Sequence, residues 1–273
     1  MGILNGTTNY ILSQMTETGV NYANALADAK KQGFAEADPT NDVCGFDAAR
    51  KLAILSSIGF RANVTFDDVL VEGIEKIDKS DIQYAKDMGY TIKLLTVALR
   101  QENGIALNVY PAFLPDNHPL SSVKGAYNAI YVTGNIVDDV MFYGRGAGAL
   151  PTASAVMGDV ISTAQHILNG STGTGMIMTD TKRIPFYSSL KLQNSYYFRL
   201  DVDDVTGVLS QIAAAFAEND ISICEVVQKR KTKGLAELVL ITELASRESI
   251  LQVEKALQVL PCMRKVANVI RVM

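Results

Sequence analysis

The last third of the chain carries an order of strand-like and helix-like segments that few folds accommodate. From residue 196 onward, apolar residues alternate in some segments and recur every three or four positions in others, which are the periods of strands and helices. The predicted order is strand, helix, strand, strand, helix and strand, over residues 196–202, 205–217, 221–230, 236–242, 246–260 and 267–272. This βαββαβ order predicts a ferredoxin-like fold, an architecture that does not by itself define a function.

The preceding part of the chain predicts another unit, which begins with helices and continues with strands. Apolar spacing and the stops at Gly19 and Gly33 predict helices over residues 6–18, 22–33 and 46–59. Segments rich in β-branched and aromatic residues predict strands over residues 92–100, 105–113, 129–133 and 140–143. We therefore expect an α+β fold with a mostly antiparallel sheet, divided into a first domain, a linker and the ferredoxin-like domain at residues 1–170, 171–194 and 195–273.

Length and charge agree with two folded domains and disfavour binding to nucleic acid. The 273 residues correspond to about two domains of roughly 150 residues, and a hydrophobic content of 48% supplies each with a core. The net charge of −4 offers no basic surface for a polyanion. Residues from 196 onward hold ten basic and ten acidic side chains, which leaves 15 basic and 19 acidic ones, and thus the whole excess, in the first 195 residues.

Cysteine and histidine are scarce, which disfavours a zinc site, a histidine metal cluster and a disulfide framework. The three cysteines, Cys44, Cys224 and Cys262, are scattered without metal or redox spacing, so we expect neither a zinc site nor a disulfide framework. Free cysteines are typical of a reducing compartment, so we expect a cytoplasmic location. With only two histidines, any catalysis must depend on carboxylates, lysines and the backbone. No signal peptide is evident, and polar residues interrupt the longest uncharged stretch, 160–179, so we expect no membrane span.

Four acidic residues, Glu36, Asp38, Asp42 and Asp47, lie in one short loop and the start of the next helix. One interpretation is structural, because Asp-Pro begins turns and acids complement the dipole at a helix N-terminus. Asp47 and Lys51 suggest a site instead, since they are spaced for contact on one helix. On the helical wheel the pair shares a sector with Ala48, Ile54, Leu55 and Ile58. We therefore expect the pair to face the interior, where charges are costly unless pairing or function compensates.

Three motifs, in order, resemble the homoserine dehydrogenase family. They are GILNGTTNYIL at residues 2–12, EADP at 36–39 followed by Asp42 and GFDAARK at 45–51, and GRGAG at 144–148 followed by PTASAV at 151–156. The resemblance covers about residues 1–170. It implies an NAD(P)-dependent oxidoreductase that interconverts L-homoserine and L-aspartate 4-semialdehyde on the route to threonine and methionine, and a homo-oligomer, either a dimer or a tetramer.

The same resemblance implies roles for individual residues. Lys51 matches the family's catalytic lysine and Asp47 its catalytic aspartate. Glu36 and Asp42 match carboxylates that hold the amino end of the substrate, and Thr7 matches a residue that contacts the substrate. The chemistry fits, because oxidising an alcohol by hydride transfer requires loss of the hydroxyl proton, which a lysine within hydrogen-bond reach can relay. Carboxylates are also suitable partners for a substrate ammonium group.

The glycine-rich motif at residues 144–148 is weak evidence for dinucleotide binding when taken alone, because the helix-packing glycine, the ribose-binding acid and a βαβ context are missing. The resemblance assigns Gly146, Ala147 and Gly148 instead to a loop that closes over the nicotinamide end of NAD(P). We expect the main NAD(P)-binding domain to be missing from the N-terminal side of this chain. We also expect the helix over residues 151–168 to lead back toward that domain, and the chain alone to have little or no dehydrogenase activity.

The loop after the first strand of the second unit resembles that of the ACT domain, a small regulatory module that binds amino acids. The similarity lies in DVDDVTGVL at residues 201–209 and ISI at 221–223, although Thr206 stands where the family usually has proline. It implies a regulatory ligand, with threonine expected, at Asp204, Gly207, Val208 and Ile223. The alternatives are that this unit only dimerises, and that the whole chain is a non-catalytic sensor or dimerisation module for an amino acid.

Overall fold

The computed structural model describes residues 1–171, 184–232 and 234–273 of the chain. The helices of the first unit are α1 (Gly6–Thr18), α2 (Tyr22–Lys31), α3 (Thr40–Val43), α4 (Phe46–Phe60), α5 (Lys79–Asp87) and α6 (Ala149–Leu168), with short 3-10 turns η1 (Phe66–Asp68) and η2 (Pro119–Ser122). Its strands are β1 (Gly2–Ile3), β2 (Leu70–Val71), β3 (Tyr90–Gln101), β4 (Gly104–Pro115), β5 (Tyr127–Gly134) and β6 (Asp138–Arg145). The predicted helices and strands are all present, whereas α3, α5, β1 and β2 escaped prediction.

The second unit has the predicted βαββαβ order. It consists of η3 (Ser189–Lys191), β7 (Gln193–Asp203), α7 (Val208–Ala217), β8 (Ile223–Thr232), β9 (Leu235–Thr242), β10 (Ala245–Ser246), α8 (Arg247–Gln258) and β11 (Met263–Val272). Helix α7 starts three residues later than the expected Val205, because Gly207 caps it with a φ of 88°. Of the predicted linker over residues 171–194, residues 172–183 lie outside the described residues.

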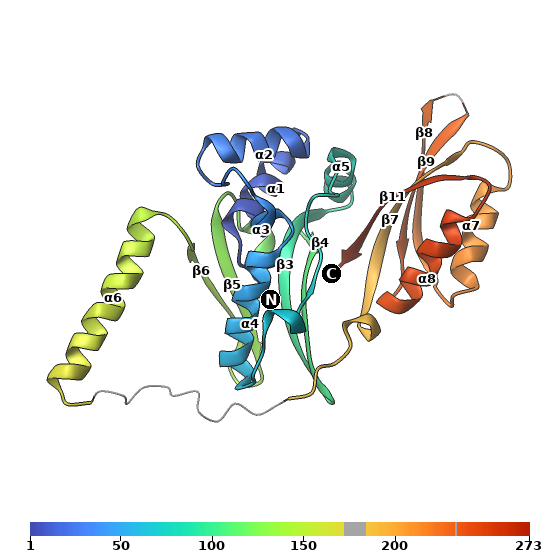
Figure 1. Ribbon diagram of the computed structural model, residues 1–273. Helices are drawn as coiled ribbons and strands as arrows, with labels where there is room; N and C mark the ends of the chain where they lie inside the picture. Colours follow the sequence, from blue (N-terminus) through green and yellow to red (C-terminus); the bar gives the residue numbers. More distant parts are fainter. Residues whose placement is uncertain (172–183, 233) are drawn as a thin grey trace.

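Within the described residues, strands of both units form one sheet of eleven strands (Figure 1). The order is β6-β5-β1-β3-β4-β11-β7-β9-β8, with β2 beside β4 and β10 beside β7. Pairing between these strands is antiparallel, except that β11 and β2 run parallel to β4. This arrangement confirms the predicted α+β fold with a largely antiparallel sheet.

Strand β11 joins the two units. It pairs with β7 along its length and, at its C-terminal end, with β4, where Arg271 and Val272 lie beside Ala112 and Phe113. Figure 1 shows the C-terminus next to β4. The hydrophobic core also crosses the junction, since Phe113 stacks on Tyr197 with ring centroids 4.6 Å apart. Two sequence patterns that look separate therefore form one continuous sheet.

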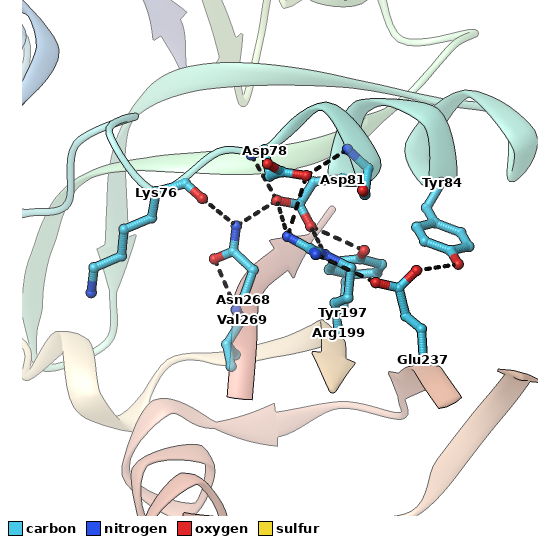
Figure 2. A network of polar contacts seen from close by, with 10 residues as sticks. Lys76, Asp78, Asp81, Tyr84, Tyr197, Arg199, Glu237, Asn268 and Val269 are labelled. Carbon is cyan, nitrogen blue, oxygen red and sulfur yellow. Dashed lines mark hydrogen bonds and ion pairs between the residues drawn. The ribbon is translucent and has the colours of Figure 1, made fainter. Parts of the chain in front are cut away.

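A buried polar network, drawn in Figure 2, reinforces the junction. Arg199 on β7 lies between two carboxylates: its Nε is 2.7 Å from Oδ1 of Asp81 at the start of α5, and its Nη1 is 3.4 Å from Glu237 on β9. Tyr197 and Asn268 also donate to Asp81, over 3.1 and 2.7 Å. Burial lowers the pKa of Arg199, but the hydrogen bond and charge of Asp81 outweigh burial and leave it above its usual value. The guanidinium therefore stays charged and paired.

Helix α6 stands apart from the sheet that precedes it (Figure 1). Its side chains are exposed apart from the half-buried Pro151. The apolar ones among them include Leu150, Val156, Met157, Val160, Ile161, Ile167 and Leu168. Among the described residues, no helix is both long enough and apolar enough to cross a membrane.

Lys93 on β3 is a buried cation held by neutral groups. Its side chain is 2% exposed, and its Nζ donates to the side-chain oxygen of Asn9 over 3.0 Å and to the carbonyl of Val123 over 2.5 Å. Its pKa falls to about 8, because burial disfavours the charged form and Lys124 repels it. Asn9 also donates to backbone carbonyls at Val123, Gly125 and Tyr127, so this pair fixes the loop that leads into β5.

The pKa of Lys93 predicts a pH dependence of stability. Between pH 8 and the ordinary lysine pKa of about 10.4, the unfolded chain holds a proton that the folded chain has released, so the free energy of unfolding rises with pH. The advantage of the wild type over Lys93→Met should thus grow by about 3 kcal/mol across this window and stay constant below pH 7. Urea denaturation of both proteins at a series of pH values measures this difference. A constant difference up to pH 10.5 would contradict the prediction.

Candidate active site

Asn5 lies at the centre of a polar cluster on the first unit. It is the N-cap of α1, and its side-chain oxygen accepts hydrogen bonds from the backbone N–H and the hydroxyl of Thr8, over 2.8 and 2.9 Å. With its orientation fixed in this way, its amide nitrogen Nδ2 donates to Asp42 Oδ1 over 2.7 Å and to Asp47 Oδ2 over 2.9 Å. One amide group therefore holds two carboxylates from different elements next to each other.

Lys51 completes the cluster from the next turn of α4. Its Nζ is 2.7 Å from Asp47 Oδ2 and donates to the carbonyl oxygen of Leu4 over 3.1 Å. The amide of Asn128 on β5 reaches the same carbonyl over 3.4 Å. The lysine nitrogen is thus positioned by a carboxylate and a backbone oxygen.

The expectation that Asp47 and Lys51 face the interior is wrong. Their side chains are 32% and 45% exposed, and Ile54 and Ile58 of the same stripe are 62% and 47% exposed. Of that stripe only Ala48 is buried, and the other buried residues of α4, Ala49, Leu52, Ala53 and Ser56, lie to one side of it. A helical wheel identifies an apolar stripe but not which side of the helix packs on the sheet. The ion pair therefore lies at the rim of α4, where a small molecule can reach it.

The other acids of the loop have different surroundings. Asp38 accepts from the backbone N–H and hydroxyl of Thr40, over 3.1 and 2.6 Å, and the hydroxyl bond in particular lowers its pKa. This contact agrees with a turn-forming role. Glu36 is exposed and makes no hydrogen bond or ion pair with the described residues. Thr7 is buried on α1 and donates to the carbonyl of Phe34 over 2.6 Å, which fixes the loop to α1.

The glycine-rich loop between β6 and α6 approaches the same region through Asn128. A Cβ atom at Gly146 would overlap the side-chain amide of Asn128, so a larger residue there would require this amide to move. Gly148 has a φ of 117° and precedes α6, which begins at Ala149 instead of the expected Pro151. Ala147 lies exposed between these two glycines. Asn128 therefore connects this loop with the carbonyl of Leu4 that Lys51 contacts.

Of the predicted site residues, the structure brings Asp42, Asp47 and Lys51 into one cluster, whereas Glu36 and Thr7 lie outside its hydrogen bonds. Asn5 and Asn128 escaped prediction. Asn5 carried a usable signal, because asparagine directly before a helix is a typical N-cap. Asn128 carried none, since its role depends on the packing of β5 against two distant loops. Among the described residues, no group of three or more His, Cys, Asp or Glu side chains is arranged to hold a metal ion.

The second unit has a small cavity of about 210 Å³ at the start of α7. Of the predicted regulatory residues, Gly207 and Val208 line this cavity, while Ile223 lies at a different hollow at the far end of α7. Asp204 is beside the cavity loop, where its N–H donates to the carbonyl of Gly234 over 3.0 Å. The cavity is otherwise lined by Val202, Asp203, Val205, Leu209, Gln228 and Leu238.

Comparison with known proteins agrees with this architecture, an α+β unit joined to a ferredoxin-like unit. The homoserine dehydrogenase family matches residues 1–161, and the ACT domain matches residues 196–262. The chain belongs to the homoserine dehydrogenase family and carries an ACT domain. A homoserine dehydrogenase from Mycobacterium tuberculosis strain H37Rv is 44% identical in an alignment of 280 positions that covers 99% of this chain and 63% of the relative.

Solved structures agree over the whole chain. A homoserine dehydrogenase from Thiobacillus denitrificans superimposes with a TM-score of 0.92 at 35% identity, and covers 100% of this chain and 63% of its own. The enzyme from S. aureus at pH 7.5 superimposes with a TM-score of 0.72 at 32% identity, with coverages of 100% and 64%. The chain thus spans somewhat less than two thirds of the length of these relatives. No comparison favours the non-catalytic alternative.

Proposed function

We propose that this chain supplies the substrate site and the regulatory unit of a homoserine dehydrogenase, which interconverts L-homoserine and L-aspartate 4-semialdehyde with NAD(P) in threonine and methionine biosynthesis. The observation that carries this proposal is the cluster of Asn5, Asp42, Asp47 and Lys51, found within the segment that matches the family. It combines a cation that can relay a proton with carboxylates that can bind an ammonium group, as the substrate requires.

Each residue of the site then has a role. Lys51 relays the proton of the substrate hydroxyl that is oxidised, while Asp47 and the carbonyl of Leu4 hold the lysine nitrogen in place. Asp42 and the exposed Glu36 bind the substrate ammonium group. Thr7 contacts the substrate and, through its bond to Phe34, fixes the loop that carries Glu36.

The residues of the glycine-rich loop fit a nicotinamide cofactor. Gly146, Ala147 and Gly148 are exposed, and the absence of a side chain at Gly146 lets the loop lie directly against Asn128 near Lys51. Bound NAD(P) supplies the hydride acceptor. We assign the main cofactor surface to a nucleotide-binding domain that these residues do not form. The exposed apolar side chains of α6, with Leu150 at 83% and Ile161 at 54%, suit a helix that packs against such a domain.

The remaining roles concern regulation, assembly and location. The ACT unit binds a regulatory amino acid, threonine, beside the loop that carries Asp204, Gly207 and Val208, with Ile223 at the following strand. The protein acts as a homo-oligomer, a dimer or tetramer, in the cytoplasm. Exposed apolar side chains on the edge strand β6, such as Met141 at 40% and Phe142 at 66%, support association through this edge.

The proposed roles predict distinct kinetic effects when the chain is assayed with a relative's nucleotide-binding domain fused upstream. Lys51→Ala should lower kcat for homoserine oxidation by roughly 10²- to 10⁴-fold, because it removes the proton relay. Glu36→Ala should mainly raise the KM for homoserine, by roughly 10- to 100-fold, because it removes a charged hydrogen bond to the ammonium group. Lys255→Ala, which removes an exposed lysine on α8, is the control. No turnover by the wild-type fusion, or equal small effects of the two variants, would contradict the assignment.

The regulatory proposal predicts that threonine binds the chain itself. Titration of the chain with L-threonine should release or absorb heat in a calorimeter and raise the melting temperature, because a ligand that binds only the folded state stabilises it. Gly207→Val should abolish both signals, since a β-branched residue is strained at a φ of 88° and would narrow the cavity. If L-threonine produced neither heat nor a shift in melting temperature, the regulatory ligand would be a different one.

A further inference from the structure

A short segment contacts both the second unit and the acidic loop, which consists of α3 and the turn into α4 at residues 40–45; these two parts are far apart in the sequence. This connecting segment, residues 70–77, contains β2 and leads to α5. We propose that Glu72 is a positioning residue, which lets Arg271 of the second unit fix the connecting segment and thereby the acidic loop, which carries Asp42. The proposal deepens the proposed function and depends on it for the role of Asp42.

On one side, residues of the second unit form hydrogen bonds with the connecting segment near both of its ends. Arg271 forms two parallel hydrogen bonds to the carboxylate of Glu72, each 2.9 Å long, and is itself 4% exposed and stacked on Tyr110 at 4.1 Å. Burial alone would raise the pKa of Glu72, but the bonds and charge of Arg271 outweigh it and lower the pKa. At the other end, the amide of Asn268 donates to the carbonyl of Lys76 over 2.9 Å.

On the other side, the connecting segment contacts the acidic loop through its backbone. The N–H of Ile74 donates to the carbonyl of Val43 over 2.8 Å. Gly73 packs so closely that a Cβ atom there would overlap the carbonyl of Val43 and the backbone of Cys44. The loop therefore lies directly on the connecting segment, one residue from Asp42.

Gly45 completes this contact at the start of α4. Its φ of 84° allows the turn into α4, and a Cβ atom there would lie 3.1 Å from Cγ1 of Val71 and 3.6 Å from the carbonyl oxygen of Glu72. The N–H of Glu72 in turn donates to Val109 on β4, over 2.7 Å. Asp42 and Asp47 lie on either side of Gly45, so a shift of the connecting segment would change the distance between the carboxylates that Asn5 holds together.

Amide hydrogen exchange on the full chain tests this linkage without any assumption about activity. Glu72→Gln keeps the size of the side chain but removes its charge, so the amides of Ile74 and of residues 43–45 should exchange roughly tenfold faster, the factor expected for losing one charge-assisted hydrogen bond. The control is Arg264→Gln, which breaks a similar bidentate pair with Asp203, 2.6 and 3.0 Å long, on the exposed side of the second unit. It should leave residues 43–45 unchanged.

Two further variants keep the test decisive if Glu72→Gln unfolds the chain. Arg271→Lys retains the charge but not the paired hydrogen bonds. It should accelerate exchange at the same amides as Glu72→Gln, but by a smaller factor. Gly73→Ala leaves Arg271 and Glu72 intact and displaces the loop directly, so it should accelerate exchange at residues 43–45. Faster exchange within residues 70–77 alone, with residues 43–45 at the wild-type rate, would overturn the proposal.

Kinetics of the fusion with a nucleotide-binding domain separate positioning from loss of folded protein. Glu72→Gln should raise the KM for homoserine roughly tenfold and leave the KM for the nicotinamide cofactor unchanged, because it displaces Asp42 and not the glycine-rich loop. A fall in kcat with an unchanged KM for homoserine would mean only that less enzyme is folded, and would overturn the positioning role. If the wild-type fusion has no turnover, the proposed function fails, while the exchange result still decides whether Glu72 positions the loop.

Discussion

The junction between β4 and β11 is the constraint on which the rest of the structure depends. A parallel strand pair aligns the two units along one sheet, and the buried charges behind it require a particular placement of each unit. Arg199 from the second unit is 8% exposed in its side chain and finds its partner Asp81, wholly buried, on a helix of the first unit. Replacing Arg199 would leave the buried carboxylate of Asp81 without its cation, at a cost of about 3–5 kcal/mol for a broken buried pair. The network therefore contributes mainly by fixing the position of one unit against the other, and less by adding to the free energy of unfolding.

The candidate active site depends on this junction indirectly. Its residues come from the N-terminal cap of α1, the short helix α3 and the start of α4, none of which belongs to the sheet. These elements meet because Asn5 binds two carboxylates and because the loop before α4 rests on the connecting segment. The connecting segment is in turn paired with β4 and held by Arg271. The ACT unit and the polar cluster are thus parts of one packed structure.

Local pattern predicted much of this fold. The bounds of α1 agree with apolar spacing and with the stop at Gly19, and the pairing of Asp47 with Lys51 follows from their spacing of four residues on one helix. The βαββαβ order of the second unit could also be predicted, because each strand and helix is long and periodic. Family resemblance, more than residue pattern, indicated which acids belong to the site.

Interactions between distant residues could not be predicted. The pairing of β11 with β4 joins residues about 160 positions apart, and Asp81 lies 118 positions from Arg199, without any local signal that they meet. The helical wheel gave the wrong orientation for α4, since its apolar stripe at Ile54 and Ile58 is exposed. The sequence indicates that Asn5 can cap α1. It does not indicate that the amide of Asn5 also binds carboxylates, because the fold decides which carboxylates lie beside it.

The two units should unfold as one cooperative body, and differential scanning calorimetry of the chain measures whether they do. If the junction holds, the chain unfolds in a single transition whose calorimetric enthalpy equals its van't Hoff enthalpy. Two separate transitions, or a calorimetric enthalpy about twice the van't Hoff value, would show that the units unfold independently and would contradict the account.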